Sequence, residues 1–360
     1  MNITTFIRDN GACGEYRVNL PYKTASFNKG FNLSRIEKGD GVDKIEKALD
    51  FADWVLIPRL SERRLIDVAK TLQKKGKRIA IDYDDDMFNI SPLSPHYEEF
   101  GLEEVNYNLG GEQIEVWKDK VNIDLTANRA RMEAVVEGLR MADMVTVTTD
   151  ILKDRYSELN GNIKVVPNCI DIPIWNKLDF KPKEEIRIGW AGGSSHYEDM
   201  CLLTLVLPEI MKKHPATKLV LVGAKFDGML KGIPSDRIEF HEWCPTPAHP
   251  YRQAILNFDI ALIPLVGNDF NSCKSVIKWT EFSGLSVPSV VSNVQPYSEV
   301  SGDTGVFVDN EPDAWIEGIS HLIENKKERI EMGKKARTYV ENNFNIHTQW
   351  QKWVDLYKGV

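Results

Sequence analysis

The chain has 360 residues, of which 42% are hydrophobic and 27% are charged. This composition is typical of a soluble globular protein, and the length suits two domains of roughly 100–200 residues each. The net charge of −8 provides no general attraction to nucleic acid or to an anionic membrane. No apolar run approaches the ~20 residues of a membrane span, and the N-terminus lacks the pattern of a signal peptide.

The cysteines indicate the compartment. Five are scattered along the chain, with no Cys-x-x-Cys pair: Cys13, Cys169, Cys201, Cys244 and Cys273. An odd, dispersed set argues against a disulfide framework and against a zinc site, and favours a reducing environment. We therefore expect a cytoplasmic protein without a bound metal.

Short apolar runs alternate with longer helical patterns along the chain, which predicts βαβ units and parallel sheets. In the first half, strands are predicted at 3–7, 54–57, 78–82, 144–148 and 164–167, and helices at 61–75, 128–141 and 150–159. In the second half, strands are predicted at 186–190, 218–222, 238–240, 260–264, 289–291 and 305–308. The predicted helices there are 201–213, 251–257, 275–284, 311–325 and 327–342. A polar linker at 173–183 separates the halves, so we predict two doubly wound α/β domains.

Three segments of the first half contain candidate functional residues. The loop 8–17 includes Gly11 and Gly14, which permit close approach of backbone N–H groups to an anion, although a glycine turn also simply joins a strand to a helix. A strand ends with Asp82-Tyr83-Asp84-Asp85-Asp86, and acids at such a position can act as a general base or bind a metal. The alternative is that they are solvated loop residues and a helix cap. The long segment 88–124, which contains His96, is typical of a lid or binding loop. The basic run 59–78 is typical of a solvated helix face. The alternative is a contact with an anionic acceptor, including the phosphate backbone of DNA.

The segment 271–284 is the most informative of the second half. Asn271 or Ser272 is positioned to cap a helix, whose free N–H groups suit a diphosphate. Lys274, Lys278 and Glu281 are spaced to share one helix face. Glu281 lies about 9 Å beyond the helix start, at about 1.5 Å per residue, which fits a ribose next to that diphosphate. The plain alternative is an ordinary amphipathic helix.

The order of several motifs resembles the GT-B glycosyltransferases, especially the retaining family four. The resemblance rests on Glu281 followed by Gly284 and Pro288, and on four further segments: 165–168, 188–193, 219–223 and 350–357. It implies two Rossmann-like domains facing across a cleft. The acceptor domain would cover 1–171, with the terminal helix 345–360 packing back onto it, and the donor domain would cover 184–344. Those enzymes carry two glutamates, and Cys273 stands in place of the first, so Asp269 is a candidate substitute.

The resemblance also implies roles for residues. The expected donor-binding residues are Gly11, Gly14, Gly192, Gly193, Trp243, Asp269, Lys274, Ser275, Lys278 and Glu281. The loop after the strand at 186–190 lacks the usual Arg and Lys, which makes Lys274 and Lys278 the natural phosphate ligands. We expect Arg17 and His96 to bind the acceptor, and Asp84, Asp85 and Lys278 to serve catalysis.

The implied activity is transfer of a hexose from a nucleotide-sugar, such as UDP-glucose, to a hydroxyl acceptor with retention of configuration. No cofactor is expected beyond this co-substrate. The default acceptor would be a glycan or a lipid-linked group. The acidic segment also resembles glycosyltransferase-like proteins of bacteriophages, which makes a hydroxymethylated DNA base a further candidate. A bacteriophage protein of this kind would work in the host cytoplasm. Two alternatives remain open, a nucleotide-sugar 2-epimerase of the same fold and a non-catalytic nucleotide-sugar-binding subunit.

Overall fold

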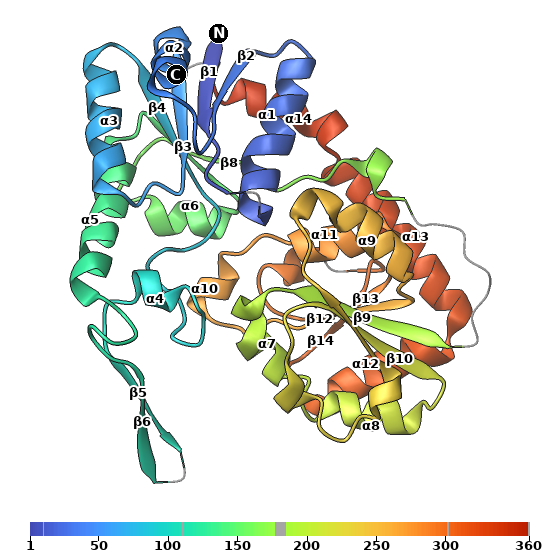
Figure 1. The fold of residues 1–360 in the computed structure, drawn as a ribbon. Coiled ribbons are helices and arrows are strands. Elements are labelled where there is room, and N and C mark those ends of the chain that lie inside the picture. Colours follow the sequence, from blue (N-terminus) through green and yellow to red (C-terminus); the bar gives the residue numbers. More distant parts are fainter. Residues whose placement is uncertain (10, 110, 177–184, 301, 359–360) are drawn as a thin grey trace. The chain divides into compact units, whose positions relative to one another are not determined.

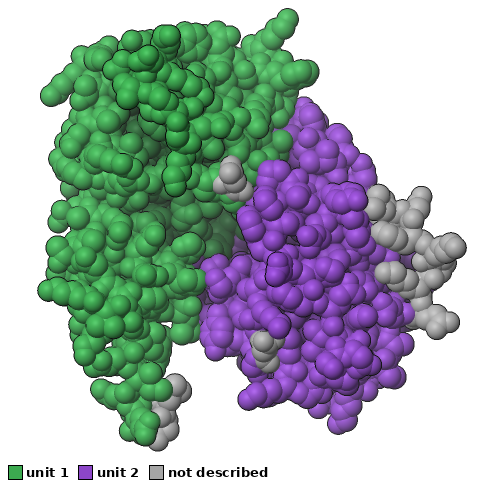
Figure 2. All heavy atoms as spheres, viewed as in Figure 1, with its two compact units in different colours: residues 1–167, 273–275, 350–360 green, residues 168–272, 276–349 purple. Residues whose placement is uncertain are grey.

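The computed structural model describes residues 1–9, 11–109, 111–176, 185–300 and 302–358 (Figure 1). The chain forms two compact units (Figure 2). The first contains residues 1–167, 273–275 and the chain from Trp350 onward; the second contains 168–272 and 276–349. Residues 177–183 of the predicted linker, and residue 184 at the predicted start of the donor domain, lie outside the described residues.

A six-stranded parallel sheet forms the centre of the first unit, in the order β2-β1-β3-β4-β7-β8. Its strands are β1 (Asn2–Phe6), β2 (Asn32–Ile36), β3 (Trp54–Pro58), β4 (Arg78–Tyr83), β7 (Met144–Val147) and β8 (Ile163–Val165). Its helices are α1 (Leu20–Phe27), α2 (Val42–Phe51), α3 (Arg63–Lys74), α5 (Leu125–Met141) and α6 (Asp150–Tyr156). Every residue of β3 is buried, as expected for a central parallel strand. The sequence patterns did not predict β2 and α2, because β2 is a largely polar edge strand.

The segment 88–124 is more structured than the predicted loop. It contains a short helix, α4 (Tyr97–Phe100), and an antiparallel hairpin of β5 (Val105–Leu109) and β6 (Glu112–Trp117), which projects from the first unit (Figure 1). Trp117 anchors the base of the hairpin: its Nε1 donates to the carbonyl of Pro92 at 2.7 Å, and its ring lies 5.7 Å from that of Tyr97.

The second unit repeats the architecture with a parallel sheet in the order β11-β10-β9-β12-β13-β14. Its strands are β9 (Ile186–Gly192), β10 (Thr217–Gly223), β11 (Ile238–Glu242), β12 (Ile260–Ile263), β13 (Ser289–Ser292) and β14 (Val306–Val308). Its helices are α7 (Tyr197–Cys201), α8 (Val206–Lys213), α9 (His249–Leu256), α10 (Asp269–Ser272), α11 (Ile277–Gly284), α12 (Pro312–Glu324) and α13 (Lys326–Asn343). The predicted fold class of two Rossmann-like domains is confirmed.

The last helix, α14 (Ile346–Asp355), starts in the second unit, and its residues from Trp350 onward belong to the first. Its end packs into an aromatic cluster of the first unit. The ring of Trp353 lies 5.6 Å from that of Tyr22, and the ring of Tyr357 lies 5.2 Å from that of Trp54. No helix among the described residues is both long and apolar enough to span a membrane.

A buried ion pair connects the segment around Arg17 with β4, and it also contacts β7 and the end of α14 in the first unit. The Arg17 guanidinium donates from Nη2 to Asp82 Oδ2 at 2.7 Å and from Nε to Asp82 Oδ1 at 3.0 Å, and both side chains are at most 2% exposed. Thr146 of β7 donates to the same carboxylate, and the Arg17 guanidinium lies 4.9 Å from the Trp353 ring. Because neither charge reaches water, each depends on the other.

We predict that Asp82→Asn lowers the free energy of unfolding by about 3–5 kcal/mol, since it leaves the Arg17 charge buried and uncompensated. Denaturant titration measures this change. Lys44→Ala is the matched control, because it removes an exposed pair with Asp40 and should leave the stability nearly unchanged. An Asp82→Asn protein as stable as the control would contradict the role given to the pair.

Candidate functional site

In the first unit, acidic side chains follow the carboxyl end of β4. Arg59, which follows β3, contacts both Asp84 and Asp85: its Nε lies 3.7 Å from Asp84 Oδ1 and its Nη2 lies 3.3 Å from Asp85 Oδ2. Its Nη1 also donates to the Cys13 Sγ at 3.1 Å. Arg59 has a φ of 48°, a left-handed conformation that is unfavourable for a non-glycine residue and occurs often at functional sites.

The two acids have different proton affinities. Desolvation by burial raises the pKa of Asp84, and the neighbouring Asp85 carboxylate adds to this effect. Burial alone would also raise the pKa of Asp85, but the cations Lys274 and Arg59 lower it below its ordinary value. Two neighbouring carboxyls separated in this way suit one as a proton acceptor and the other as a fixed negative charge. The sequence proposed either residue as a base; of the two, Asp84 is the one whose surroundings favour the protonated form.

The ligand atoms of Cys13, Asp84 and Asp85 all lie within 4.8 Å of one another, a spacing that a metal ion could bridge. Arg59 and Lys274 already balance the charge of the two carboxylates. Burial, reinforced by Asp84, also raises the pKa of the Cys13 thiol well above its ordinary value, so the thiolate that a metal prefers is disfavoured. These residues therefore suit proton chemistry better than metal binding.

The glycine loop after β1 folds around an acid. The Asp9 Oδ1 accepts the N–H groups of Gly11 at 2.8 Å and Gly14 at 3.1 Å. A Cβ at Gly14 would lie 2.1 Å from the Asp9 carbonyl oxygen, so this turn requires glycine. We predicted that these N–H groups bind a donor phosphate; in the structure they donate hydrogen bonds to the Asp9 carboxylate.

A cavity of about 230 Å³ opens between this loop and the acids, and its lining includes Arg8, Asp9, Arg17, Arg59, Asp84, His96 and Glu99. His96 is exposed at its rim, and desolvation together with the Arg59 cation lowers its pKa, which favours the neutral imidazole. Arg17 lines the cavity, but its guanidinium is committed to Asp82. Arg17 is therefore a buried structural residue, and its contact with the acceptor stays a prediction.

The helix predicted at 275–284 is present but starts two residues later, and its predicted cap at Asn271 or Ser272 is wrong. The chain forms α10 (Asp269–Ser272), leaves the helix at 273–276 and starts α11 only at Ile277. The amide of Asn271 donates to the Val266 carbonyl, and the hydroxyl of Ser272 donates to that of Asp269, so neither caps α11. In the described residues, no side chain caps the start of α11 at Val276.

Residues 273–275 belong to the first unit, which changes the expected role of Lys274 and Ser275. Cys273 is fully buried in the apolar core, with its carbonyl accepting the Thr149 hydroxyl at 3.0 Å. The Lys274 Nζ lies 3.4 Å from Asp85 Oδ1. Lys274 therefore does not share a helix face with Lys278 and Glu281, and its ion pair joins it to the acids of the first unit.

In the second unit, Glu281 on α11 is buried beside two residues of α9 that the sequence analysis missed. The His249 Nδ1 lies 3.2 Å from Glu281 Oε1, and the Gln253 Nε2 lies 3.4 Å from Glu281 Oε2. The Gln253 Oε1 is a buried acceptor without a hydrogen-bond partner in the part of the chain that the structure describes. The sequence held no signal for this contact, since Gln253 lies in the predicted helix 251–257 but His249 precedes it.

Trp243 completes this group. Its side chain is 54% exposed, and its ring meets that of His249 edge-on, with centroids 6.5 Å apart and an interplanar angle of 85°. An exposed aromatic face next to a buried carboxylate suits a nucleoside, because the base can stack while the ribose reaches the acid. The Trp243 ring is therefore accessible to a ligand and is not part of the core.

Lys278 lies one turn before Glu281 on α11. Its ammonium is 5.1 Å from the centroid of the Trp190 ring, and a Cβ at Gly192 would come within 3.0 Å of its Nζ. Gly192 ends β9, so the cation lies at the carboxyl end of a parallel strand, where ligands bind in such sheets. There is room for a side chain at Gly193, because a Cβ there would lie 4.0 Å from its nearest neighbour, Ser195 Oγ. The predicted donor residue Asp269 is exposed at the start of α10.

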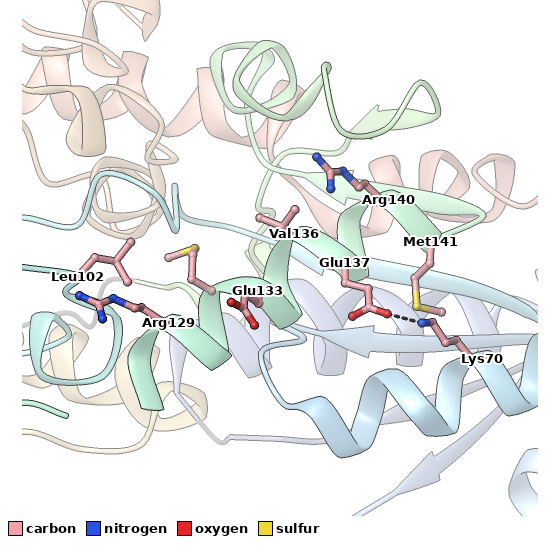
Figure 3. A pocket seen from close by; sticks show the side chains of 9 residues that line it. Lys70, Leu102, Arg129, Glu133, Val136, Glu137, Arg140 and Met141 are labelled. Atoms are coloured by element: carbon pink, nitrogen blue, oxygen red, sulfur yellow. Dashed lines mark hydrogen bonds and ion pairs between the residues drawn. The ribbon is translucent and has the colours of Figure 1, made fainter. Parts of the chain in front are cut away.

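A separate groove of about 730 Å³ follows α5 in the first unit (Figure 3). Its lining includes Lys70, Arg129, Met132, Glu133, Val136, Glu137 and Arg140. Glu137 pairs with both Lys70 and Arg63 of α3. None of the predicted site residues lines this groove. The basic run of α3 is therefore partly neutralised, in agreement with its interpretation as a solvated helix face.

Residues 185–325 match the family model described as "Glycosyl transferases group 1". The structure is similar over 99% of its length to 98% of sucrose-phosphate synthase from Thermosynechococcus elongatus (13% identity, TM-score 0.65). It is also similar over its full length to all of HepE from Anabaena, solved with UDP and glucose (13% identity, TM-score 0.64). No curated protein matches the sequence.

The fold is GT-B. Residues 185–325 form a glycosyltransferase domain, and they contain Lys278, Glu281 and the residues around Glu281. The structure is also similar over 98% of its length to 94% of a putative UDP-N-acetylglucosamine 2-epimerase from Listeria monocytogenes (13% identity, TM-score 0.54). The shared fold thus extends to a protein that is described as an epimerase and not as a glycosyltransferase.

We predict that Lys274→Met raises the pKa of Asp85, because the largest favourable charge on that carboxylate is removed. Asp85 titrates below its ordinary value of 3.8 in the folded protein, so the pair stabilises the fold above that pH and stops doing so as the pH falls through the lowered pKa. Carboxyl-carbon NMR titration measures the shift. Lys335→Met, which removes an exposed pair with Asp303, should leave Asp85 unchanged; an equal response in both variants would contradict the assignment.

Proposed function

We propose that the protein transfers a hexose from a nucleotide-sugar, most simply UDP-glucose, to a hydroxyl acceptor with retention of configuration. The observation that carries this proposal is the group around Glu281: a buried carboxylate held by His249 and Gln253 beside the exposed Trp243 ring. All four residues lie inside the matched glycosyltransferase domain. HepE, which shares the fold, was solved with UDP and glucose, and this supports a uridine nucleotide as the donor.

The donor binds through complementary chemistry at each of its parts. The Glu281 carboxylate accepts one ribose hydroxyl, and the buried Gln253 Oε1 beside it is an acceptor suited to the other. The base stacks on Trp243. The diphosphate meets the start of α11, where N–H groups point outward, and the ammonium of Lys278. Asp269 remains the candidate contact to the sugar in place of Cys273.

The reaction breaks the bond between the anomeric carbon and the diphosphate oxygen, and forms a bond from that carbon to the acceptor oxygen. Lys278 and the N-terminus of α11 stabilise the negative charge that the leaving diphosphate gains. The acceptor proton passes to the departing phosphate or to Asp84, whose raised pKa suits it to hold a proton. The cavity beside Asp84 and His96 is the proposed acceptor site.

The charges around that cavity bear on the acceptor. Arg8 pairs with Glu62, Arg17 with Asp82, and Arg59 with Asp84 and Asp85. Three basic residues of α3, Arg63, Arg64 and Lys70, pair with Glu62, Asp67 and Glu137. A DNA acceptor needs cations available to phosphates. The paired cations therefore favour a glycan or lipid-linked hydroxyl over a hydroxymethylated DNA base, the acceptor expected of a bacteriophage enzyme.

A 2-epimerase is the second candidate, because a putative UDP-N-acetylglucosamine 2-epimerase shares the fold and two acids of different pKa lie together in the first unit. A non-catalytic binding subunit is the third, because a buried cysteine replaces the expected first glutamate.

The deciding experiment measures UDP release from a panel of UDP-sugars, with glycan, lipid-linked or hydroxymethylated-DNA acceptors, while UDP binding is followed by calorimetry. Acceptor-dependent release supports the transferase and identifies the acceptor. Release of UDP together with the 2-epimeric sugar, without an acceptor, would establish the epimerase. Binding without turnover of any donor would establish the binding subunit, and failure to bind UDP would reject the uridine donor.

We predict that Glu281→Ala weakens UDP binding about 10–100-fold, because hydrogen bonds to a charged group contribute about 1.5–3 kcal/mol and each 1.4 kcal/mol is tenfold. Calorimetry measures the dissociation constant. Glu324→Ala, at an exposed position on α12 of the same unit, is the control and should bind UDP normally. Normal binding by Glu281→Ala would remove this carboxylate from the site.

We predict that Lys278→Ala lowers kcat by about 100-fold and changes the dissociation constant of the UDP-sugar much less. A cation that serves the leaving group interacts most strongly when the transition state concentrates charge on the diphosphate. Steady-state kinetics with parallel binding measurements separate the two effects. Equal losses in binding and in turnover would instead assign Lys278 to ground-state binding alone.

A further inference from the structure

The histidine next to Glu281 is held in an unusual way. The His249 Nδ1 faces the carboxylate of Glu281 at 3.2 Å, and its Nε2 faces the backbone carbonyl of Cys244 at 3.0 Å. When Glu281 is ionised, neither of these partners can donate a hydrogen bond; both can only accept one. A neutral imidazole has one N–H and can satisfy one of them, whereas the imidazolium donates to both. The geometry therefore selects the charged form of His249.

The electrostatic surroundings agree with the geometry. Burial alone would lower the pKa of His249, but the hydrogen bond and the negative charge of Glu281 outweigh it and raise the pKa. The other titratable groups described around this pair are the thiol of Cys244, the hydroxyl of Tyr297 and the guanidinium of Arg252. Desolvation by burial raises the pKa of the Cys244 thiol and of the Tyr297 hydroxyl, so both groups stay protonated near neutral pH.

We propose that His249 is a positioning residue for nucleotide binding: as a cation it fixes the Glu281 carboxylate toward the ribose and offsets its charge next to an anionic diphosphate. This role rests on the proposed uridine-nucleotide donor. A lone carboxylate would repel the diphosphate, and the adjacent imidazolium removes most of that cost. Nucleotide affinity should consequently be highest below the raised pKa of His249 and should fall as the pH rises through it.

The test uses two substitutions that separate the two nitrogens. In His249→Asn the amide nitrogen takes the approximate place of Nδ1 and keeps an uncharged donor toward Glu281. In His249→Gln the amide nitrogen takes the approximate place of Nε2 and keeps the donor toward the Cys244 carbonyl. His214→Asn, at a histidine of the second unit that contacts Ser320, is the control. Calorimetry follows UDP binding from pH 7 to pH 8.5, where the terminal phosphate is already ionised.

We expect the wild type and His214→Asn to lose UDP affinity by about tenfold as the pH rises, as the loss of one charged hydrogen bond implies. His249→Asn should give a flat profile near the high-pH affinity of the wild type. His249→Gln should be flat and weaker still, because Glu281 loses the donor that faces its Oε1, while the contact from Gln253 to Oε2 remains. Since UDP is common to all four proteins, its own ionisation cancels in the comparison.

A measurement on the wild type alone does not depend on how the variants fold. Saturation with UDP should raise the pKa of the His249 imidazole, seen by NMR, because binding and protonation favour each other equally. Parallel pH profiles for the wild type and His249→Asn, or an imidazole pKa that UDP leaves unchanged, would overturn the role of His249 while the uridine donor stands. Failure of the wild type to bind UDP would overturn both.

Discussion

The first unit depends on a pair of charges that water does not reach. Arg17 and Asp82 join the helix after the glycine loop to the end of β4, and the same carboxylate receives Thr146 from β7. The guanidinium also faces the ring of Trp353 near the end of the chain. Breaking one partner would leave a buried charge unpaired, so these four elements hold or fail together. Only Tyr83 separates Asp82 from Asp84 and Asp85, and the position of these two acids therefore depends on this pair.

A second principle recurs in both units: the candidate site acids Asp84, Asp85 and Glu281 each lie beside a basic side chain. Asp85 pairs with Lys274, Asp84 lies beside Arg59, and Glu281 contacts His249. The identity of the cation determines the behaviour of the acid. Lysine and arginine remain charged at every relevant pH, whereas histidine titrates near neutrality. The acids of the first unit therefore keep a fixed electrostatic environment, while the environment of Glu281 responds to pH.

The elements that were predicted from sequence are those with strong local signals. The buried strands β3, β9 and β12 consist of short apolar runs, and helices such as α5 and α12 show a clear period, so their positions follow from nearby residues. Glu281 was singled out for the same reason, by its place on a helix between two strands. What surrounds it was not visible, because His249 and Gln253 are 32 and 28 residues away in sequence.

The largest local error shows what such patterns cannot contain. The spacing of Lys274 and Lys278 predicted a common helix face. The chain leaves the helix there because distant groups hold it: the hydroxyl of Thr149, 124 residues away, binds the carbonyl of Cys273, and Asp85, 189 residues away, binds Lys274. Tertiary contacts thus override the helical propensity of the segment, and the helix starts at Ile277.

The same contacts explain why a cysteine replaces the first glutamate of the pattern that this segment resembles. Cys273 is fully buried in the apolar core of the first unit, and its Sγ lies 3.9 Å from Asp86. A carboxylate in that position would be desolvated and would face another carboxylate, and both effects disfavour its ionisation. A small, weakly polar thiol meets neither cost. Position 273 is therefore a packing position in this protein, and the exposed Asp269 remains the proposed contact to the donor sugar.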